Sequence, residues 1–195
     1  MKRLMILTAT MVCSFTMYAQ SEMASSPQTD ALYRLPFDKG VECVAHSLTP
    51  VRMGLGHNHN LVDFCAWELI ATEATAVVAP REGVVELIDE RGVLIRHEEN
   101  IYTRLRGLQE VVVSIGDCVA KGDVLANIAD GVSVWMEVFY QTPNPDYGTE
   151  ALGGKGKFLT HYINPVFSVR GRCKAQLTDG NPYTTKARTW CWPWE

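Results

Sequence analysis

Two histidines and an aspartate stand close together in the segment GHNHNLVDF, residues 56–64. His57 and His59 are two residues apart, and Asp63 follows His59 at the fourth position. Imidazole nitrogens and carboxylate oxygens are ligands of Zn²⁺ in hydrolytic enzymes, where three protein ligands leave one position open for water. The segment could therefore be a working zinc site, half of a former one, or a polar turn that leads into a strand.

Other kinds of catalytic centre find little support in the sequence. No Gly-x-Ser-x-Gly motif occurs, so the nucleophile elbow of a serine hydrolase is not indicated. Cys118 stands in a predicted turn beside Asp117 and Asp123, whose carboxylates would raise the pKa of its thiol and would not activate it as a nucleophile. No pair of acidic residues has a spacing that identifies a glycosidase.

Short apolar segments separated by Gly, Pro and Asp make up the middle of the chain. Strands of about four to eight residues, spaced about ten residues apart, are predicted for ATAVVAP, GVVELID, GVLIRHE, IYTRLRG, EVVVSIGD, DVLANIA and VSVWMEVFY. No helical periodicity extends over three turns in this region. The sequence therefore predicts an all-β fold, a sandwich or barrel of antiparallel strands.

The N-terminus has the pattern of a secretory signal peptide. Lys2 and Arg3 precede an apolar run without acidic residues, and Ala19 provides a small residue near a cleavage site. The run is short for a membrane span, although a retained anchor is the alternative. We expect residues 1–20 to be the signal peptide and residues 21–34, rich in Ser, Thr and Gln, to be a flexible leader. The protein would then be secreted or periplasmic, with no membrane span after cleavage.

Charge and cysteine content narrow the classes of partner and site. Loss of the two basic residues of the signal peptide changes the net charge from -4 to -6, which argues against a nucleic-acid partner. The five remaining cysteines contain no Cys-x-x-Cys pair, so a structural zinc–thiolate site is not indicated. Their odd number leaves one thiol unpaired or bonded to another chain.

The C-terminal segment differs in composition from the rest of the chain. The sequence TDGNP, residues 178–182, predicts a turn. Cys173 and Cys191 flank this turn at comparable distances, which makes a loop closed by a Cys173–Cys191 disulfide the simplest hypothesis. Three alternating tryptophans would share one face of an extended strand, where they would either cover the domain or form a stacking surface: Trp190, Trp192 and Trp194.

Taken together, these motifs resemble the lysostaphin-type (LytM-like) zinc metallopeptidases, which cut peptide cross-links in bacterial cell walls. The likeness covers residues 35–167 and leaves residues 168–195 as a Cys- and Trp-rich extension. Four segments carry it: His59-Asn-Leu-Val-Asp63 for the His-x3-Asp motif, residues 74–85 for the Gly-Thr-Pro-Val segment, residues 113–123 for the paired Val-x-x-Gly turns, and Asn164-Pro165 for the closing Asn-Pro. The resemblance implies an antiparallel β fold of the duplicated hybrid-motif type.

The same resemblance implies that most of the zinc centre has been lost. When the chain is aligned on the family's Phe-Glu-Val, the third zinc ligand falls on Trp135 and a catalytic histidine falls on Ser133. A further family histidine falls on Gly107. Indole is not a zinc ligand, and a serine hydroxyl does not act as a base near neutral pH.

Two members of the family's ligand set remain, His59 and Asp63, as vestigial metal ligands, with His57 as a candidate substitute. No cofactor is expected, and any zinc would be held weakly. His97 is interpreted as structural, and His46 stands in no ligand pattern.

The preferred interpretation is a secreted, catalytically inactive LytM-like domain that binds cell-wall peptide or an envelope protein. The first alternative is a zinc-dependent cell-wall endopeptidase in which His57, His59 and Asp63, or the distant His161, converge on one metal. The second is an adaptor module, because residues 79–88 and 113–128 also resemble the two halves of biotinyl/lipoyl-type domains. The Met-Lys-Met pattern of a carrier lysine does not occur between those halves.

Overall fold

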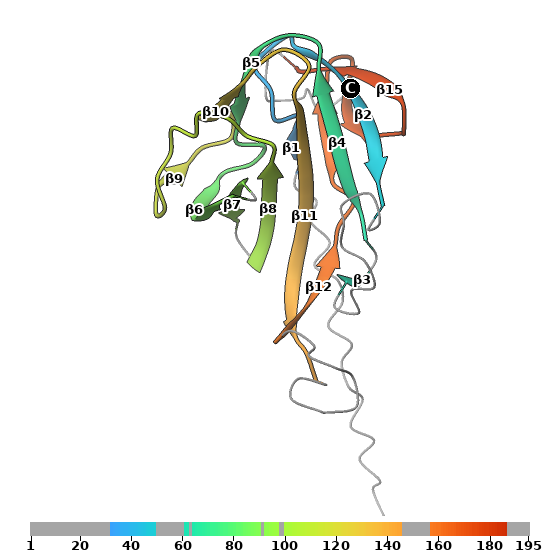
Figure 1. Cartoon of the computed structure of the whole chain (residues 1–195). Coiled ribbons are helices and arrows are strands. Elements are labelled where there is room, and N and C mark those ends of the chain that lie inside the picture. The colour runs from blue at the N-terminus through green and yellow to red at the C-terminus, as the bar shows by residue number, and fades with distance from the viewer. Residues whose placement is uncertain are drawn as a thin grey trace, which may run out of the picture.

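The structure is a computed structural model, and it describes residues 32–49, 61–62, 64–90, 92–97, 100–145 and 157–186 (Figure 1). In this part of the chain the regular secondary structure consists of β-strands, and no α-helix occurs. The predicted all-β fold is therefore confirmed. Within the same residues, no helix has the length and apolar character needed to cross a membrane.

The strands are short, apart from one long central strand. In chain order they are β1 (Leu32–Arg34), β2 (Glu42–Leu48), β3 (Leu61–Val62), β4 (Ala66–Ala71), β5 (Thr75–Val78), β6 (Gly83–Asp89), β7 (Gly92–Arg96), β8 (Ile101–Arg106), β9 (Cys118–Val119), β10 (Val124–Ile128), β11 (Ser133–Pro143), β12 (Phe158–Tyr162), β13 (Val166–Val169), β14 (Arg172–Ala175) and β15 (Asn181–Thr184).

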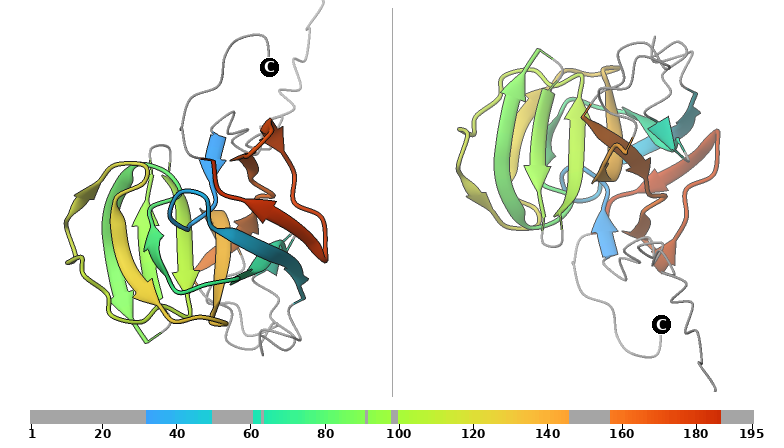
Figure 2. Two further views of the ribbon diagram at one scale, coloured as in Figure 1. Left: turned by 90° about the horizontal axis from the view of Figure 1, so that it is seen from above. Right: turned by 90° about the horizontal axis from the view of Figure 1, so that it is seen from below.

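One large sheet contains most of these strands, in the order β15-β2-β4-β11-β8-β7-β6-β9, and β12 and β3 continue it beside the second half of β11. The strands β1, β13 and β14 form a second sheet, and β5 and β10 form a separate pair. Seen from above, the green and yellow strands curve around one side of the molecule, while the red C-terminal strands lie on the other (Figure 2).

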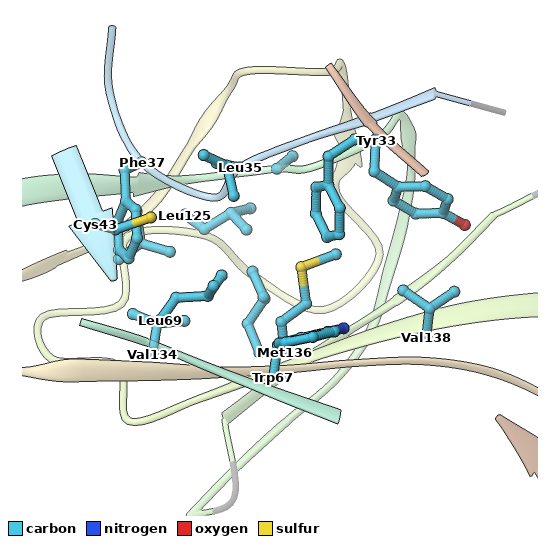
Figure 3. Close-up of a cluster of buried hydrophobic side chains, with 14 of the residues drawn as sticks. Tyr33, Leu35, Phe37, Cys43, Trp67, Leu69, Leu125, Val134, Met136 and Val138 are labelled. Carbon is cyan, nitrogen blue, oxygen red and sulfur yellow. The ribbon is translucent and has the colours of Figure 1, made fainter. Parts of the chain in front are cut away.

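The central strand β11 has one face in the core and one face outside it. Val134, Met136 and Val138 are buried, and β4 contributes Leu69 to the same core. Figure 3 shows these side chains directed toward residues of the N-terminal segment, among them Tyr33, Leu35 and Phe37. Because side chains alternate along a strand, the intervening residues of β11 point away from this core.

The described β structure begins inside the segment predicted to be a leader. Residues 32–34 form β1, which pairs in parallel with β13. Tyr33 is fully buried, and its ring centroid lies 6.4 Å from that of Phe167. Burial of this aromatic ring stabilises β1, although the residues that precede it in the sequence are mostly polar.

The segment EVVVSIGD, residues 110–117, is not a strand, although its valines predict one. The carboxylate of Asp117 accepts a hydrogen bond from the backbone N–H of Ser114 at 2.8 Å, which closes a turn. Such local bonds compete with the pairing of a β ladder. Val112 and Ile115 are consequently 59% and 61% exposed.

The beginning of the predicted C-terminal extension is part of the sheets. The strand β14 pairs with β13, and β15 pairs with β2. The predicted turn at residues 178–182 is present, with Gly180 at a φ of 74°. Cys191 and the three tryptophans of the extension lie outside the described residues, so the Cys173–Cys191 disulfide stays a prediction. Among the described cysteines, those with free thiols are Cys43, Cys65 and Cys118.

Candidate functional site

The outer face of β11 carries Ser133, Trp135 and Glu137, which alternate with the buried Val134 and Met136. Side chains two residues apart in a strand share a face. The two positions at which the resemblance predicts lost histidines, Ser133 and Trp135, therefore lie next to one another on the same surface.

The third such position, Gly107, directly follows β8 and lies against the start of β11. A Cβ atom added to Gly107 would stand 2.4 Å from the backbone oxygen of Ser133, and the φ of Gly107 is 78°. Both the contact and the left-handed backbone exclude larger residues. A histidine at position 107 would therefore require the backbone to move.

A pocket with a volume of about 470 Å³ opens at this place. All three positions line it, together with residues from the neighbouring turns and from the end of β8: Glu90, Arg106, Gly107, Val132, Ser133 and Trp135. Pockets that bind small ligands have volumes of about 300–1,000 Å³ and combine apolar walls with a few polar groups. The pocket thus has the size and lining of a binding site.

The indole of Trp135 is held in place from β4. Its Nε1–H donates a hydrogen bond to Oε1 of Glu68 at 3.2 Å, and the two residues are direct cross-strand partners. A tryptophan whose N–H is satisfied presents its ring as a rigid apolar surface. Trp135 therefore forms a wall of the pocket where a zinc enzyme would have a ligand.

A buried ion pair lies beside the pocket. Glu137 is 2% exposed, and its Oε1 lies 2.9 Å from Nε of Arg106, whose side chain is 17% exposed. The two atoms are not aligned as a hydrogen bond, so the contact is mainly electrostatic. The hydroxyl of Tyr162 donates to Oε2 of Glu137 at 3.3 Å. Burial raises the pKa of Glu137 and outweighs the opposing effect of Arg106 and Arg104.

A row of aromatic rings continues the same face beyond Glu137. Phe139 is the cross-strand partner of both Tyr102 and Tyr162. Its ring centroid lies 5.6 Å from that of Tyr102 and 5.9 Å from that of Tyr162, and Phe64 lies 4.7 Å beyond Tyr162. The face therefore changes along β11 from pocket to ion pair to aromatic row.

Several of these residues were missed in the sequence. The alternation in the strand Ile101–Arg106 places Arg104 and Arg106 on one face, and that signal alone would have predicted a pair of cations beside β11. The position of Glu90 in the pocket has no local signal, because it depends on how the β6–β7 turn approaches β11.

The three described histidines do not line the pocket. His97 is 2% exposed, and burial lowers its pKa to about 4, so its ring is neutral near pH 7. Its Nδ1 donates to the carbonyl of Glu82 at 2.6 Å, and its Nε2 accepts from the hydroxyl of Thr103 at 2.7 Å. His46 lies 3.5 Å from Asp179.

His161 is held on β12, away from the pocket. Its Nε2 lies 2.7 Å from the hydroxyl of Thr142, and its ring stacks on Tyr140 with centroids 4.7 Å apart. These contacts account for the imidazole of His161 within the sheet.

The remaining predicted ligands, His57, His59 and Asp63, lie outside the described residues. Within the described ranges, no group of three His, Cys, Asp or Glu residues is placed to hold a metal ion. The described residues that line the pocket do not fit zinc either, since glycine and indole supply no ligand atom, and one carboxylate (Glu90) with one hydroxyl (Ser133) does not provide three zinc ligands.

The structure is similar to that of pseudoalterin, described as a novel M23 metalloprotease from the deep sea, with 12% identity and a TM-score of 0.45 over 82% of this chain and 97% of the other. It is also similar to a variant of the catalytic domain of the prophage-encoded M23 protein EnpA from Enterococcus faecalis, with 20% identity and a TM-score of 0.38 over 54% of this chain and 92% of the other.

Both neighbours are M23 proteins. No family model matches the chain, and no curated protein matches it. What the pocket does is therefore inferred from its own residues.

Proposed function

We propose that the protein is a secreted, non-hydrolytic LytM-like domain whose outer β11 face binds a peptide of the bacterial cell envelope. The observation that carries this proposal is the pocket of about 470 Å³, lined by Gly107, Ser133 and Trp135. These are the positions at which the resemblance to lysostaphin-type peptidases implies histidines. A concave site is present where the catalytic imidazoles would be, and its lining suits binding.

The chemistry of the lining supports binding without hydrolysis. Peptide hydrolysis by zinc requires three ligands, an open position and a base that activates water. The indole of Trp135 and the backbone of Gly107 supply neither ligand nor base. Among the described acids, Glu90 lines the pocket as a single exposed carboxylate, and Glu137 beside the pocket is buried and faces Arg106 at 2.9 Å.

The lining of the pocket supports a peptide as the ligand. Arg106, Ser133 and Trp135 offer a cation, a hydroxyl and an aromatic ring, whereas Glu137 and Phe139 further along β11 are buried, at 2% and 5% exposed. Aromatic rings and arginine are the side chains most often found at peptide interfaces.

Location in the envelope is supported by the sequence. Residues 1–20 have the pattern of a secretory signal, and the net charge of -6 after its removal makes nucleic acid an unfavourable partner. An envelope peptide is the ligand class that agrees with both the location and the resemblance.

The proposal is tested by measuring zinc and peptide binding on the same sample. The secreted form of the protein and its His59→Ala variant would be purified without added metal, and their zinc content measured after dialysis. Both would then be titrated calorimetrically with soluble cell-wall peptides, and the mixtures checked for cleavage by mass spectrometry. We expect zinc far below one per chain in both proteins, equal binding and no cleavage.

Zinc near one per chain that is lost in His59→Ala, together with peptide cleavage, would contradict the proposal. That outcome would establish the zinc-dependent endopeptidase with relocated ligands, including His57, His59 and Asp63.

A further inference from the structure

We infer that the pocket binds the end of a peptide that carries both a free carboxylate and a free ammonium group. This inference rests on the proposed function and specifies the ligand of the same site. It follows from two charged residues of opposite sign among the described residues that line the pocket, Arg106 and Glu90.

Arg106 supplies the site for the carboxylate. Its Nε lies 2.9 Å from Glu137, which places this edge of the guanidinium against the buried acid. The same side chain lines the pocket, and its two terminal nitrogens make no hydrogen bond within the described part of the chain. A guanidinium with two free terminal nitrogens can bind a carboxylate in a two-point geometry.

The charge balance beside the pocket leaves Arg106 available for a ligand. Arg104 and Arg106 both act on Glu137, so two cations share one buried carboxylate. Two other acids are nearby: Glu68 bonds to the indole of Trp135, and Glu90 lines the pocket. If a ligand carboxylate bound Arg106, two anions, the ligand and Glu137, would face two cations, Arg104 and Arg106. The charges would then balance.

Glu90 supplies the site for the ammonium group. It is exposed in the turn between β6 and β7. The ring of Trp135 lines the same pocket, and an ammonium group over an indole gains about 0.5–2 kcal/mol. One carboxylate and one indole together favour a cation over a neutral group.

The remaining lining limits the size and polarity of the ligand end. Val132 contributes an apolar side chain, and Ser133 contributes a small hydroxyl. A volume of about 470 Å³ lies in the lower part of the range for small-molecule pockets, so the pocket holds a terminal group and the rest of the peptide lies outside it.

The test uses three peptides that differ in one charge each. The first is N-acetyl-Ala-Ala-Lys, which has a free carboxylate and a side-chain ammonium group. The second is its C-terminal amide, and the third has an acetylated lysine side chain. Binding to the unmodified protein would be measured by calorimetry at low and moderate salt. We expect each modification to weaken binding about tenfold, the effect of losing roughly one charged contact.

Variants assign each charge to its residue. Glu90→Gln should lower the affinity for the first peptide and leave that for the acetylated-lysine peptide unchanged, while Glu73→Gln, an exposed acid outside the pocket, should change neither. Arg106→Lys keeps the charge opposite Glu137 but removes the two-point geometry, so it should reduce the difference between the acid and the amide.

The outcomes separate this inference from the proposed function. Equal binding of all three peptides would overturn the inference and leave the proposed function in place. Absence of binding to these peptides and to soluble cell-wall peptides would overturn both.

Discussion

Two polar regions beside β8 differ in how well their buried groups are satisfied. At His97, both ring nitrogens have partners, at 2.6 Å and 2.7 Å, and the ring is neutral near pH 7. At Glu137, the carboxylate faces Arg106 at 2.9 Å without hydrogen-bond alignment. A fully satisfied polar network stabilises one structure, whereas a buried polar group without full hydrogen bonding costs free energy.

The position of each region agrees with this difference. His97 lies under the turn at Glu82 and contacts the buried Tyr33, with ring centroids 6.0 Å apart. Arg106 and its neighbours line the pocket. The buried His97 therefore serves the fold, while Arg106 and its neighbours form a concave surface.

The largest loss of stability is expected when the ion pair between Glu137 and Arg106 is removed. Arg106→Ala leaves the carboxylate of Glu137, which is 2% exposed, without its closest cation. Removal of one partner of a buried ion pair typically costs about 3–5 kcal/mol. We expect the free energy of unfolding, measured with urea, to fall by about this amount.

The double variant Arg106→Ala/Glu137→Gln provides the control for this prediction. It removes the buried charge as well, so it should recover most of the lost stability. An equal loss in the single and double variants would show that Arg106 stabilises the fold by packing and not by its charge.

The second effect is a pH dependence that arises from the His97 region. Folding lowers the pKa of His97 from 6.5 to about 4, so between these values the unfolded chain binds more protons than the folded one. Stability due to His97 is therefore complete above pH 6.5 and is lost as the pH falls toward 4. The loss amounts to about 3 kcal/mol at pH 4 and below.

Urea unfolding at several pH values would measure this effect. The variant His97→Gln, which cannot take up a proton, should lose the slope between pH 4 and 6.5. His46→Gln, a substitution of a more exposed histidine, should keep it. A slope that persists in His97→Gln would assign the pH dependence to other groups.

The fold was more predictable from the sequence than the site. Alternation and turn residues located strands such as Gly83–Asp89 and Ile101–Arg106, because these signals are local. The strand predicted at residues 110–117 was wrong, because the turn closed by Asp117 outweighs the β propensity of the valines. The last residues of the predicted leader, 32–34, form β1, and its pairing with β13 joins segments far apart in the chain, which local signals do not show.

For the site, the sequence predicted only which positions lie together, and not the shape or the full lining of the pocket. The resemblance indicated that Gly107, Ser133 and Trp135 belong together, and the structure brings them to one pocket. That Glu90 and Arg106 would complete the lining depends on sheet curvature and side-chain direction, which one sequence does not specify.

The smallest effect concerns whether the pocket wall at Gly107 is rigid. Gly107 and Gly131 have similar left-handed backbones, with φ values of 78° and 73°. A Cβ at Gly107 would lie 2.4 Å from the oxygen of Ser133, whereas at Gly131 nothing lies within 4 Å. Gly131→Ala should cost about 1 kcal/mol for the backbone alone, and Gly107→Ala about 2–3 kcal/mol because the contact adds strain.

The comparison of these two variants isolates the contact from the conformation, because the backbone cost is common to both. Urea unfolding would give the two free energies, and peptide titration would show whether the pocket keeps its shape. If Gly107→Ala is no more destabilising than Gly131→Ala, the backbone at Ser133 shifts at little cost, and a histidine at position 107 could be accommodated by that shift. A larger cost at Gly107 would mean that the backbone at Ser133 excludes an imidazole at this position, so that introducing histidines at positions 107, 133 and 135 would not by itself create a zinc centre.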